Sequence, residues 1–266
     1  MTNSHRQRWI TAAVILPFLI VAVLMGGWVL LAAMIAVSAL AQYELYSMFW
    51  PGRTKLIYKL GGCLLGAGFL YGAFIENPAL MLGCLAASFW MGSLGFLTAY
   101  GTGNTQARFQ NAQVVTAGML YLPAVIHTVL YLSNVEIALV LLAAFATDIG
   151  GFYVGCRFGK HKIWPSVSPK KSWEGSLGGM ALCMLVCLCV GLLFGTAPWW
   201  AWLILGVFLN CAAQLGDFFE SALKRTLGIK DSGTILPGHG GLLDRIDSIL
   251  LALPAYVLAN ALYPFF

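Results

Sequence analysis

Charged residues and glycines gather near the C-terminal end of a chain that is otherwise poor in charge. Only 9% of its 266 residues are charged, yet the stretch from Ser221 to Asp247 carries Lys-Arg, Lys-Asp and Asp-Arg-x-Asp motifs. Asp217 and Glu220 stand just before it. Charged groups in a hydrophobic setting are costly and are commonly retained for binding or catalysis. The pattern therefore predicts a functional site in this stretch.

The acids of this region fall at the ends of two predicted helices. If the helix predicted over 199–220 continues to about residue 227, one face carries four polar residues at i, i+3, i+4 and i+7, namely Asp217, Glu220, Ser221 and Lys224. Asp244 and Asp247 share a face at the start of the next helix. Acids from two helices can bind a hard divalent cation such as Mg²⁺, which takes one or two carboxylates and leaves positions for phosphate oxygens.

Glycines and basic residues lie between these two groups of acids. The glycines are Gly228, Gly233, Gly238, Gly240 and Gly241. A loop of this kind can fold tightly and bring backbone N–H groups to an anionic ligand. The alternative is mutual ion pairing of the acids with Lys224, Arg225 and Arg245, which does not require so many glycines. The surplus of cations favours a substrate more anionic than one metal ion can neutralise.

A lone acid, Asp148, lies inside a hydrophobic segment that is predicted as a helix over 135–155. A carboxyl group in lipid is expensive unless it faces a cavity or a cation, so Asp148 is a candidate member of the acidic site. A purely structural role, bonded to a neighbouring helix, is the alternative. Gly150, Gly151 and Gly155 follow it and would let another helix or a ligand approach closely.

A second basic motif, SPKKSWEG over 168–175, comes directly before a long hydrophobic segment. Either Ser168, followed by a proline, or Ser172 suits the N-cap of the helix that begins here. Free N–H groups at that helix end, with Lys170 and Lys171 beside them, could cradle a polyphosphate. Two adjacent lysines also fit a simple anchor to anionic lipid, which is the alternative. The spacing of a Walker loop is absent.

Composition places these motifs in a polytopic membrane protein. Hydrophobic residues make up 60% of the chain and the mean hydropathy is +0.82, well above the values of soluble proteins. We predict an all-α protein with about nine transmembrane helices of roughly 20 residues, over 10–25, 28–49, 56–75, 78–99, 112–132, 135–155, 175–195, 199–220 and 242–262. The first of these is predicted to be retained rather than cleaved as a signal peptide.

Basic residues give the orientation, because Lys and Arg gather in the cytoplasmic segments of membrane proteins. With a cytoplasmic N-terminus and these spans, all 15 Lys and Arg residues fall on the cytoplasmic side, and the outer turns carry only Glu76 and Glu136 as charges. The active site is therefore predicted at the cytoplasmic side. We treat 1–266 as a single integral membrane domain, with N-terminal helices over 1–135 and catalytic helices and loops over 136–266.

These motifs resemble those of the phosphatidate cytidylyltransferases, also called CDP-diacylglycerol synthases. The signature of that family has Ser, a spacer, an aliphatic residue, Lys-Arg, four residues and Lys-Asp, and later His-Gly-Gly ahead of Asp-Arg-x-Asp. The chain matches it at Ser221, Leu223, Lys224, Arg225, Lys230, Asp231, Gly233, Leu236, Pro237, His239, Gly240, Gly241, Leu242, Asp244, Arg245 and Asp247. The resemblance is strong over 140–250 and includes the SPKKSWEG segment.

The resemblance implies transfer of CMP from CTP to phosphatidate, which gives CDP-diacylglycerol and pyrophosphate in phospholipid biosynthesis. It implies Mg²⁺ as the cofactor, with room for a second cation. CTP, phosphatidate and the lipid bilayer are the expected partners; no nucleic-acid partner is expected, and a homodimer is allowed. The expected location is a bacterial inner (cytoplasmic) membrane, which the chain crosses several times.

The same resemblance assigns roles to individual residues. The implied metal ligands are Asp217 and Asp244, with Asp148 completing the acidic pocket. The implied catalytic residues are Asp217, Asp244, Asp247, Lys224, Arg225 and His239, the last as a donor to a phosphate or to departing pyrophosphate. Substrate contacts are implied for Ser168, Lys170, Lys171, Ser172, Glu174, Ser221, Lys230, Asp231 and Arg245.

Two other functions fit parts of the sequence. A transporter or channel would use intramembrane acids for ions or protons, but it predicts polar residues at both faces of the membrane, whereas the predicted outer face is nearly free of charge. A related enzyme could use CTP on another lipid, such as an archaeal-type ether lipid or a polyprenol. That enzyme would differ mainly in an apolar groove that the motifs do not describe.

Overall fold

The computed structural model describes residues 17–105, 107–233 and 240–266. Over these residues the named elements are all helices, and eight helical segments are long and apolar enough to cross a membrane. The prediction of an all-α polytopic membrane protein is confirmed. Residues 10–16 of the predicted span 10–25 lie outside the described residues, and 17–25 are helical, so the count of nine and the orientation stay predictions.

Two compact units divide the chain. The first unit comprises Met1–Leu130 and Asp231–Asp244, and the second comprises Tyr131–Lys230 and Arg245–Phe266. The first division falls close to the predicted boundary at 135. The glycine-rich loop, which the sequence assigned to the catalytic half, belongs to the unit of the N-terminal helices. Each unit is described below by itself.

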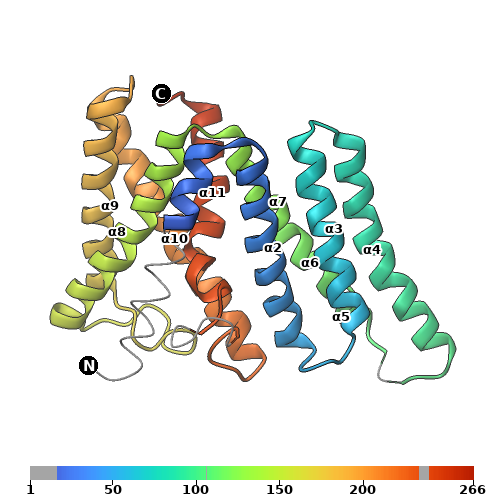
Figure 1. The fold of residues 1–266 in the computed structure, drawn as a ribbon. Coiled ribbons are helices and arrows are strands. Elements are labelled where there is room, and N and C mark those ends of the chain that lie inside the picture. Colours follow the sequence, from blue (N-terminus) through green and yellow to red (C-terminus); the bar gives the residue numbers. More distant parts are fainter. Residues whose placement is uncertain (1–16, 106, 234–239) are drawn as a thin grey trace. The chain divides into compact units, whose positions relative to one another are not determined.

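Among its described residues, the first unit contains a helical stretch over 17–25, three long helices and one broken span (Figure 1). Helix α3 packs against both α2 and α4. The bounds are α2 Gly27–Phe49, α3 Leu56–Phe74, α4 Pro78–Gly101, α5 Phe109–Ala112, α6 Val114–Tyr121, α7 Pro123–Ile126 and η1 His127–Tyr131.

Glycines on α3 allow this close packing. A Cβ atom at Gly62 would lie 2.6 Å from the Tyr46 ring of α2, and one at Gly72 would lie 3.2 Å from Leu80 of α4. Only a residue without a side chain lets the neighbouring helices approach this closely.

The span predicted over 112–132 is not one continuous helix, which corrects the expectation. It is divided into α5, α6, α7 and η1, and the break between α6 and α7 falls at Leu122, just before Pro123. Proline has no N–H to donate and its ring disfavours a helical conformation in the preceding residue. The segment still has the length and hydropathy of a membrane span, over Val114–Tyr131.

Four long helices form the second unit: α8 Asn134–Phe158, α9 Trp173–Phe194, α10 Trp199–Thr226 and α11 Leu243–Leu262, the last beginning at the end of the first unit's loop. Helix α9 packs against α8 and α10. A Cβ atom at Gly150 would lie 2.6 Å from the Gly178 carbonyl oxygen, and one at Gly179 would lie 2.6 Å from that of Thr147. The glycines after Asp148 thus admit another helix, as the sequence allowed.

A buried acid ties α8 to α11 at the opposite end of α8 from the basic motifs. Glu136 accepts hydrogen bonds from the Tyr256 hydroxyl at 2.7 Å and from the Asn260 amide at 3.1 Å. It also forms a capping box with Ser133, whose N–H donates to it at 2.7 Å. Glu136 is only 8% exposed, so it stabilises the helix end rather than standing free in an outer turn.

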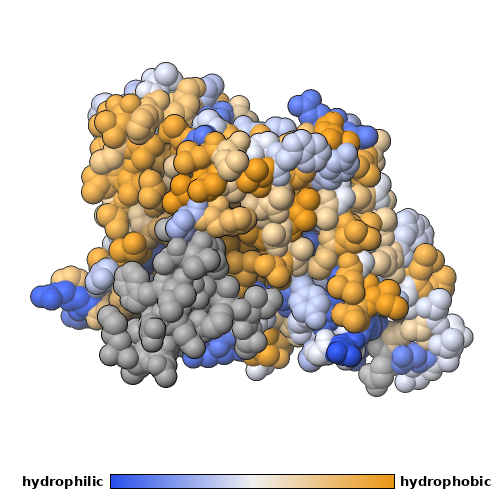
Figure 2. Space-filling view, viewed as in Figure 1, coloured by the Kyte–Doolittle hydropathy of each residue, from blue (hydrophilic) through white to orange (hydrophobic). Residues whose placement is uncertain are grey.

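Hydrophobic residues cover much of the helical surface on the face shown in Figure 2. Large apolar side chains such as Leu64, Leu82 and Leu193 are 66–74% exposed on α3, α4 and α9. Such surface is expected where lipid rather than water surrounds the helices.

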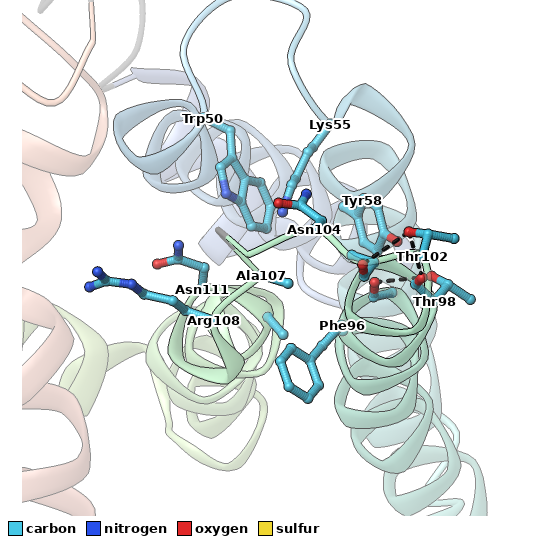
Figure 3. A pocket seen from close by; sticks show the side chains of 14 residues that line it. Trp50, Lys55, Tyr58, Phe96, Thr98, Thr102, Asn104, Ala107, Arg108 and Asn111 are labelled. Atoms are coloured by element: carbon cyan, nitrogen blue, oxygen red, sulfur yellow. Dashed lines mark hydrogen bonds between the residues drawn. The ribbon is translucent and has the colours of Figure 1, made fainter.

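The first unit also has an open pocket of about 560 Å³ near the end of α4 (Figure 3). Its lining combines aromatic, polar and basic side chains, including Trp50, Tyr58, Asn111 and Arg108. The Lys55 ammonium lies 5.0 Å from the centre of the Trp50 ring. At this distance the two side chains form a cation–π contact.

Candidate active site

Three carboxyl groups from three helices meet in the second unit. Asp148 comes from α8, Asp217 from α10 and Asp247 from α11, and the three interact electrostatically with one another. We call these three residues the acidic cluster. Lys171 lies against it, with its ammonium nitrogen 2.5 Å from Oδ2 of Asp217. The structure therefore brings together four of the residues that the sequence singled out.

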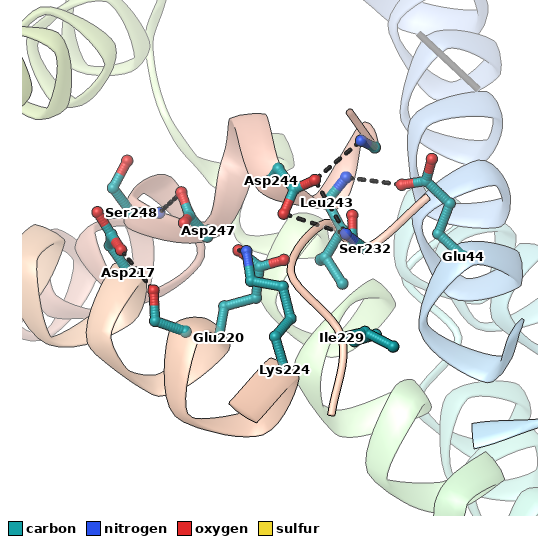
Figure 4. Close-up of polar contacts among 12 residues, drawn as sticks. Glu44, Asp217, Glu220, Lys224, Ile229, Ser232, Leu243, Asp244, Asp247 and Ser248 are labelled. Atoms are coloured by element: carbon teal, nitrogen blue, oxygen red, sulfur yellow. Dashed lines mark hydrogen bonds and ion pairs between the residues drawn. The ribbon is translucent and has the colours of Figure 1, made fainter. Parts of the chain in front are cut away.

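Small polar groups surround the acidic cluster. The Ser221 hydroxyl donates to Oδ1 of Asp217 at 3.2 Å, and the Ser248 N–H donates to Oδ1 of Asp247 at 2.7 Å (Figure 4). Arg245 is within electrostatic reach of Asp148. Asp148 itself is classed among the exposed residues of the unit.

The segment between α8 and α9 positions Lys171. Lys162 and Ser172 form an antiparallel bridge, and the Trp173 N–H donates to the His161 carbonyl at 2.9 Å. Of the two serines proposed as N-cap, Ser172 caps α9, since its buried hydroxyl accepts from the Gly175 N–H at 3.2 Å. This turn places Lys171 beside the acids.

Glu174 stabilises the same segment. Its carboxylate accepts from the backbone N–H groups of Lys160 and His161 and lies 2.6 Å from Nδ1 of the His161 ring. Lys170 contributes its carbonyl oxygen to the Lys162 ammonium at 3.3 Å. Glu174 thus has a structural role in this segment, in addition to the substrate contact that the resemblance implied.

Helix α10 continues to Thr226, so the predicted polar face is present. Lys224 pairs with Glu220 at 3.2 Å, one turn apart, and both side chains are buried. Glu220 also lies within electrostatic reach of Asp247. It is therefore part of the site, although the sequence reasoning did not include it among the site residues; its i+3 spacing from Asp217 was the available signal.

Two backbone carbonyls hold Arg225. Its Nε donates to Val167 and its Nη1 donates to Ile229, both at 3.3 Å. The end of α10 is thereby joined to the segment that carries Lys171. Gly228, at a φ of 69°, then ends the helix in a conformation that favours glycine.

The loop of the first unit surrounds Asp244. Oδ2 of Asp244 accepts hydrogen bonds from the Ser232 N–H at 3.0 Å and from the Gly241 N–H at 2.8 Å (Figure 4). Glu44, on α2, accepts from the Leu243 N–H at 2.9 Å. Asp231 is exposed, as is Lys230 at the end of the second unit. His239 lies outside the described residues, together with 234–238.

The residues present fit a hard cation such as Mg²⁺. Over the described part of the chain no group of three His, Cys, Asp or Glu side chains has the arrangement of a ready-made metal site. Mg²⁺ commonly uses one or two carboxylates and completes its shell with water and substrate oxygens. The acidic cluster supplies such oxygens, and a Lys171 cation already lies on one of them. Asp217 and Asp244 belong to different units, so their pairing as ligands stays a prediction.

An apolar pocket of about 380 Å³ opens on the same helix as Asp217. Four of its lining residues recur along α10 at i, i+3, i+4 and i+7, and two come from the segment before α9: Leu215, Phe218, Phe219, Ala222, Trp164 and Val167. The Phe218 ring lies 4.5 Å from the Lys171 ammonium and 4.8 Å from the Trp164 ring. A polar, cation-bearing edge and an apolar hollow thus lie next to each other.

Comparison with known proteins decides the family. The model of the cytidylyltransferase family matches residues 6–263, which is nearly the whole chain. The chain belongs to this family. A phosphatidate cytidylyltransferase of Staphylococcus haemolyticus is 34% identical over 94% of this chain and 96% of that protein.

Two further relatives carry the same name. The phosphatidate cytidylyltransferase of Bacillus subtilis is 36% identical over 58% of this chain and 60% of its own length. That of Mycobacterium bovis is 46% identical over 47% of this chain and 40% of its own length. The resemblance first seen in the motifs is confirmed.

Proposed function

We propose that the protein is a phosphatidate cytidylyltransferase, which transfers CMP from CTP to phosphatidate and releases CDP-diacylglycerol and pyrophosphate. The observation that carries the proposal is the acidic cluster, joined from three helices with the Lys171 ammonium against Asp217. Family membership over almost the full chain supports the same activity. The bacterial relatives support a bacterial cytoplasmic membrane as its location.

Charge explains why this site suits the reaction. An oxygen of the lipid phosphate attacks the α-phosphorus of CTP, the bond to the bridging oxygen breaks, and pyrophosphate leaves with that electron pair. The attacking oxygen is already ionised at neutral pH, so a general base is not required. Catalysis then consists mainly of positioning two polyanions and neutralising their charge.

Each group of residues has a task in this scheme. Asp217, with Asp148 or Asp247, would hold Mg²⁺, and the bound ion would neutralise charge on the phosphates. The Lys171 ammonium would leave Asp217, its carboxylate partner, and contact a phosphate of the substrate. Asp244 stays a proposed ligand on the sequence pattern alone, and a second cation is part of the same proposal.

The apolar pocket on α10 would hold an acyl chain of the lipid. Its lining is free of charged side chains, which suits hydrocarbon, and Phe218 forms its boundary with Lys171. A CTP phosphate bound by Lys171 would therefore lie next to the acyl chain of the acceptor. This arrangement favours a lipid acceptor over a soluble phosphate ester.

The test uses purified full-length protein in detergent micelles with Mg²⁺ and CTP labelled at the α-phosphorus. Phosphatidate, a polyprenyl phosphate, an archaeal-type ether-lipid phosphate and glycerol 3-phosphate are offered as acceptors in parallel. We expect label in CDP-diacylglycerol and one pyrophosphate released per product. Label only in another lipid would reassign the acceptor, and ion flux in liposomes without any turnover would favour a transporter.

A further inference from the structure

A second acid in a hydrophobic span, Glu44, holds the loop that the sequence associates with catalysis. Glu44 lies on α2, is 2% exposed, and accepts the Leu243 N–H at 2.9 Å (Figure 4). The two residues are 199 positions apart in the chain. An acid in a membrane-spanning helix is costly, so this contact has to offset a considerable penalty.

The loop is shaped around the Glu44 carboxyl group. The Leu242 N–H and the Ser232 hydroxyl also interact with it. A Cβ atom at Gly233 would lie 2.6 Å from Oε1 of Glu44, and one at Gly241 would lie 2.6 Å from Oε2. Two glycines of the motif are therefore needed for close contact with Glu44.

Helix ends explain why a carboxyl group belongs there. The first N–H groups of a helix have no partner within it and carry a partial positive charge. Leu243 is the first residue of α11, and its N–H and that of Leu242 are directed at Glu44. Glu44 thus caps α11 from another helix.

Glu44 and Asp244 act on the same short segment. Asp244 accepts the N–H groups of Ser232 and Gly241, while Glu44 contacts the side chain of Ser232 and lies against Gly241. Both acids thus hold residues of the same segment. Removing the Glu44 carboxylate is therefore expected to loosen the segment to which Asp244 is bonded.

We propose that Glu44 is a positioning residue for Asp244 and the start of α11. This proposal rests on the proposed cytidylyltransferase activity, since it gives Glu44 a catalytic consequence without contact to substrate. Glu44→Gln keeps the size of the side chain but presents an amide to the N–H groups. Glu44→Asp keeps the charge but shortens the reach by one methylene group.

The matched control is Glu136→Gln, because Glu136 is also a buried acid that accepts a backbone N–H near a helix start. A displacement of about 1 Å in a positioned group can cost about 100-fold in rate. We expect Glu44→Gln to lower kcat by about 10- to 100-fold, with KM for CTP changed by less than about threefold. Glu44→Asp is expected to recover part of the loss, and Glu136→Gln to lower thermal stability while leaving kcat per folded molecule unchanged.

A double-mutant cycle with Asp244→Asn tests the route of the effect. If Glu44 acts through Asp244, adding Glu44→Gln to Asp244→Asn changes the residual rate little. Additive losses, or a Glu44→Gln enzyme with a normal kcat and lower thermal stability only, would overturn the proposal.

Hydrogen–deuterium exchange keeps the test independent of the assigned activity. Amides of 240–246 should exchange faster in Glu44→Gln than in the parent protein and in Glu136→Gln. Unchanged exchange would refute the positioning role, whether or not the protein is active toward CTP and phosphatidate. If the parent protein is inactive but Glu44→Gln alters the exchange, only the proposed function is refuted.

Discussion

Lys171→Met is expected to weaken the use of CTP while easing the requirement for Mg²⁺. The substitution keeps the length of the side chain and removes the ammonium that lies 2.5 Å from Asp217. A hydrogen bond to a charged group contributes about 1.5–3 kcal/mol, which corresponds to a fall in kcat/KM for CTP of about 10- to 150-fold. Because 27% of the Lys171 side chain and 26% of Asp217 are exposed, solvent screening favours the lower half of that range.

The dependence of the Lys171→Met rate on Mg²⁺ concentration tests the contact with Asp217 more specifically. Without the ammonium the acidic cluster is more negative, so the Mg²⁺ concentration that gives half-maximal rate should fall. Initial rates with labelled CTP, measured over a matrix of CTP and Mg²⁺ concentrations, separate the two effects. Lys162→Met is the control, since Lys162 lies on the same segment and its ammonium group donates to a backbone carbonyl. It should change either quantity by less than about twofold.

Two results would refute the role given to Lys171. If Lys171→Met leaves kcat/KM for CTP unchanged and alters only the dependence on phosphatidate, Lys171 serves the lipid substrate. An increased Mg²⁺ requirement would show that Lys171 does not compete with a cation at Asp217.

Three further substitutions test other parts of the structure. Gly233→Ala should reduce kcat and stability, since its Cβ atom would lie 2.6 Å from Glu44 and overpacking costs about 1–3 kcal/mol; Gly83→Ala, with open space around it, should be neutral in the same assays. Tyr256→Phe removes the hydroxyl that donates to Glu136 at 2.7 Å, at a cost of about 1.5–3 kcal/mol, and should lower the unfolding temperature without changing kcat per folded molecule. Ala222→Trp should fill the apolar pocket and raise KM for phosphatidate but not for CTP, whereas Ile204→Trp, at an exposed position of the same helix, should change neither; equal effects on both substrates would contradict an acyl-chain site.

Local periodicity was enough to predict one side of the site. The i, i+3, i+4, i+7 spacing from Asp217 to Lys224 predicted the extension of α10, which the structure confirms to Thr226. A lone acid in an apolar segment correctly drew attention to Asp148, which joins the acidic cluster. These signals are visible in sequence because they depend on neighbours within one helix.

Other features depend on contacts that no short segment reveals. Glu44 meets its partner 199 residues away, although it carried the same signal as Asp148, an acid in an apolar span. The outer-turn charge Glu136 turned out to be buried because Tyr256 and Asn260 of α11 bond to it. The break before Pro123 could have been predicted from the sequence, since proline disfavours a continuous helix. The uninterrupted hydrophobicity of the segment led instead to the prediction of one continuous span.

The measurement that tests the central claim most directly compares the parent protein with Asp217→Asn in the labelled-CTP assay with phosphatidate. Asn keeps the size of the side chain and removes the charge at the middle of the acidic cluster. We expect the rate of CDP-diacylglycerol formation to fall at least about 1,000-fold, without full recovery in excess Mg²⁺, while Glu76→Gln, in an exposed turn, stays near the parent rate. Turnover by Asp217→Asn within a few-fold of the parent would contradict the assignment of this cluster as the catalytic centre.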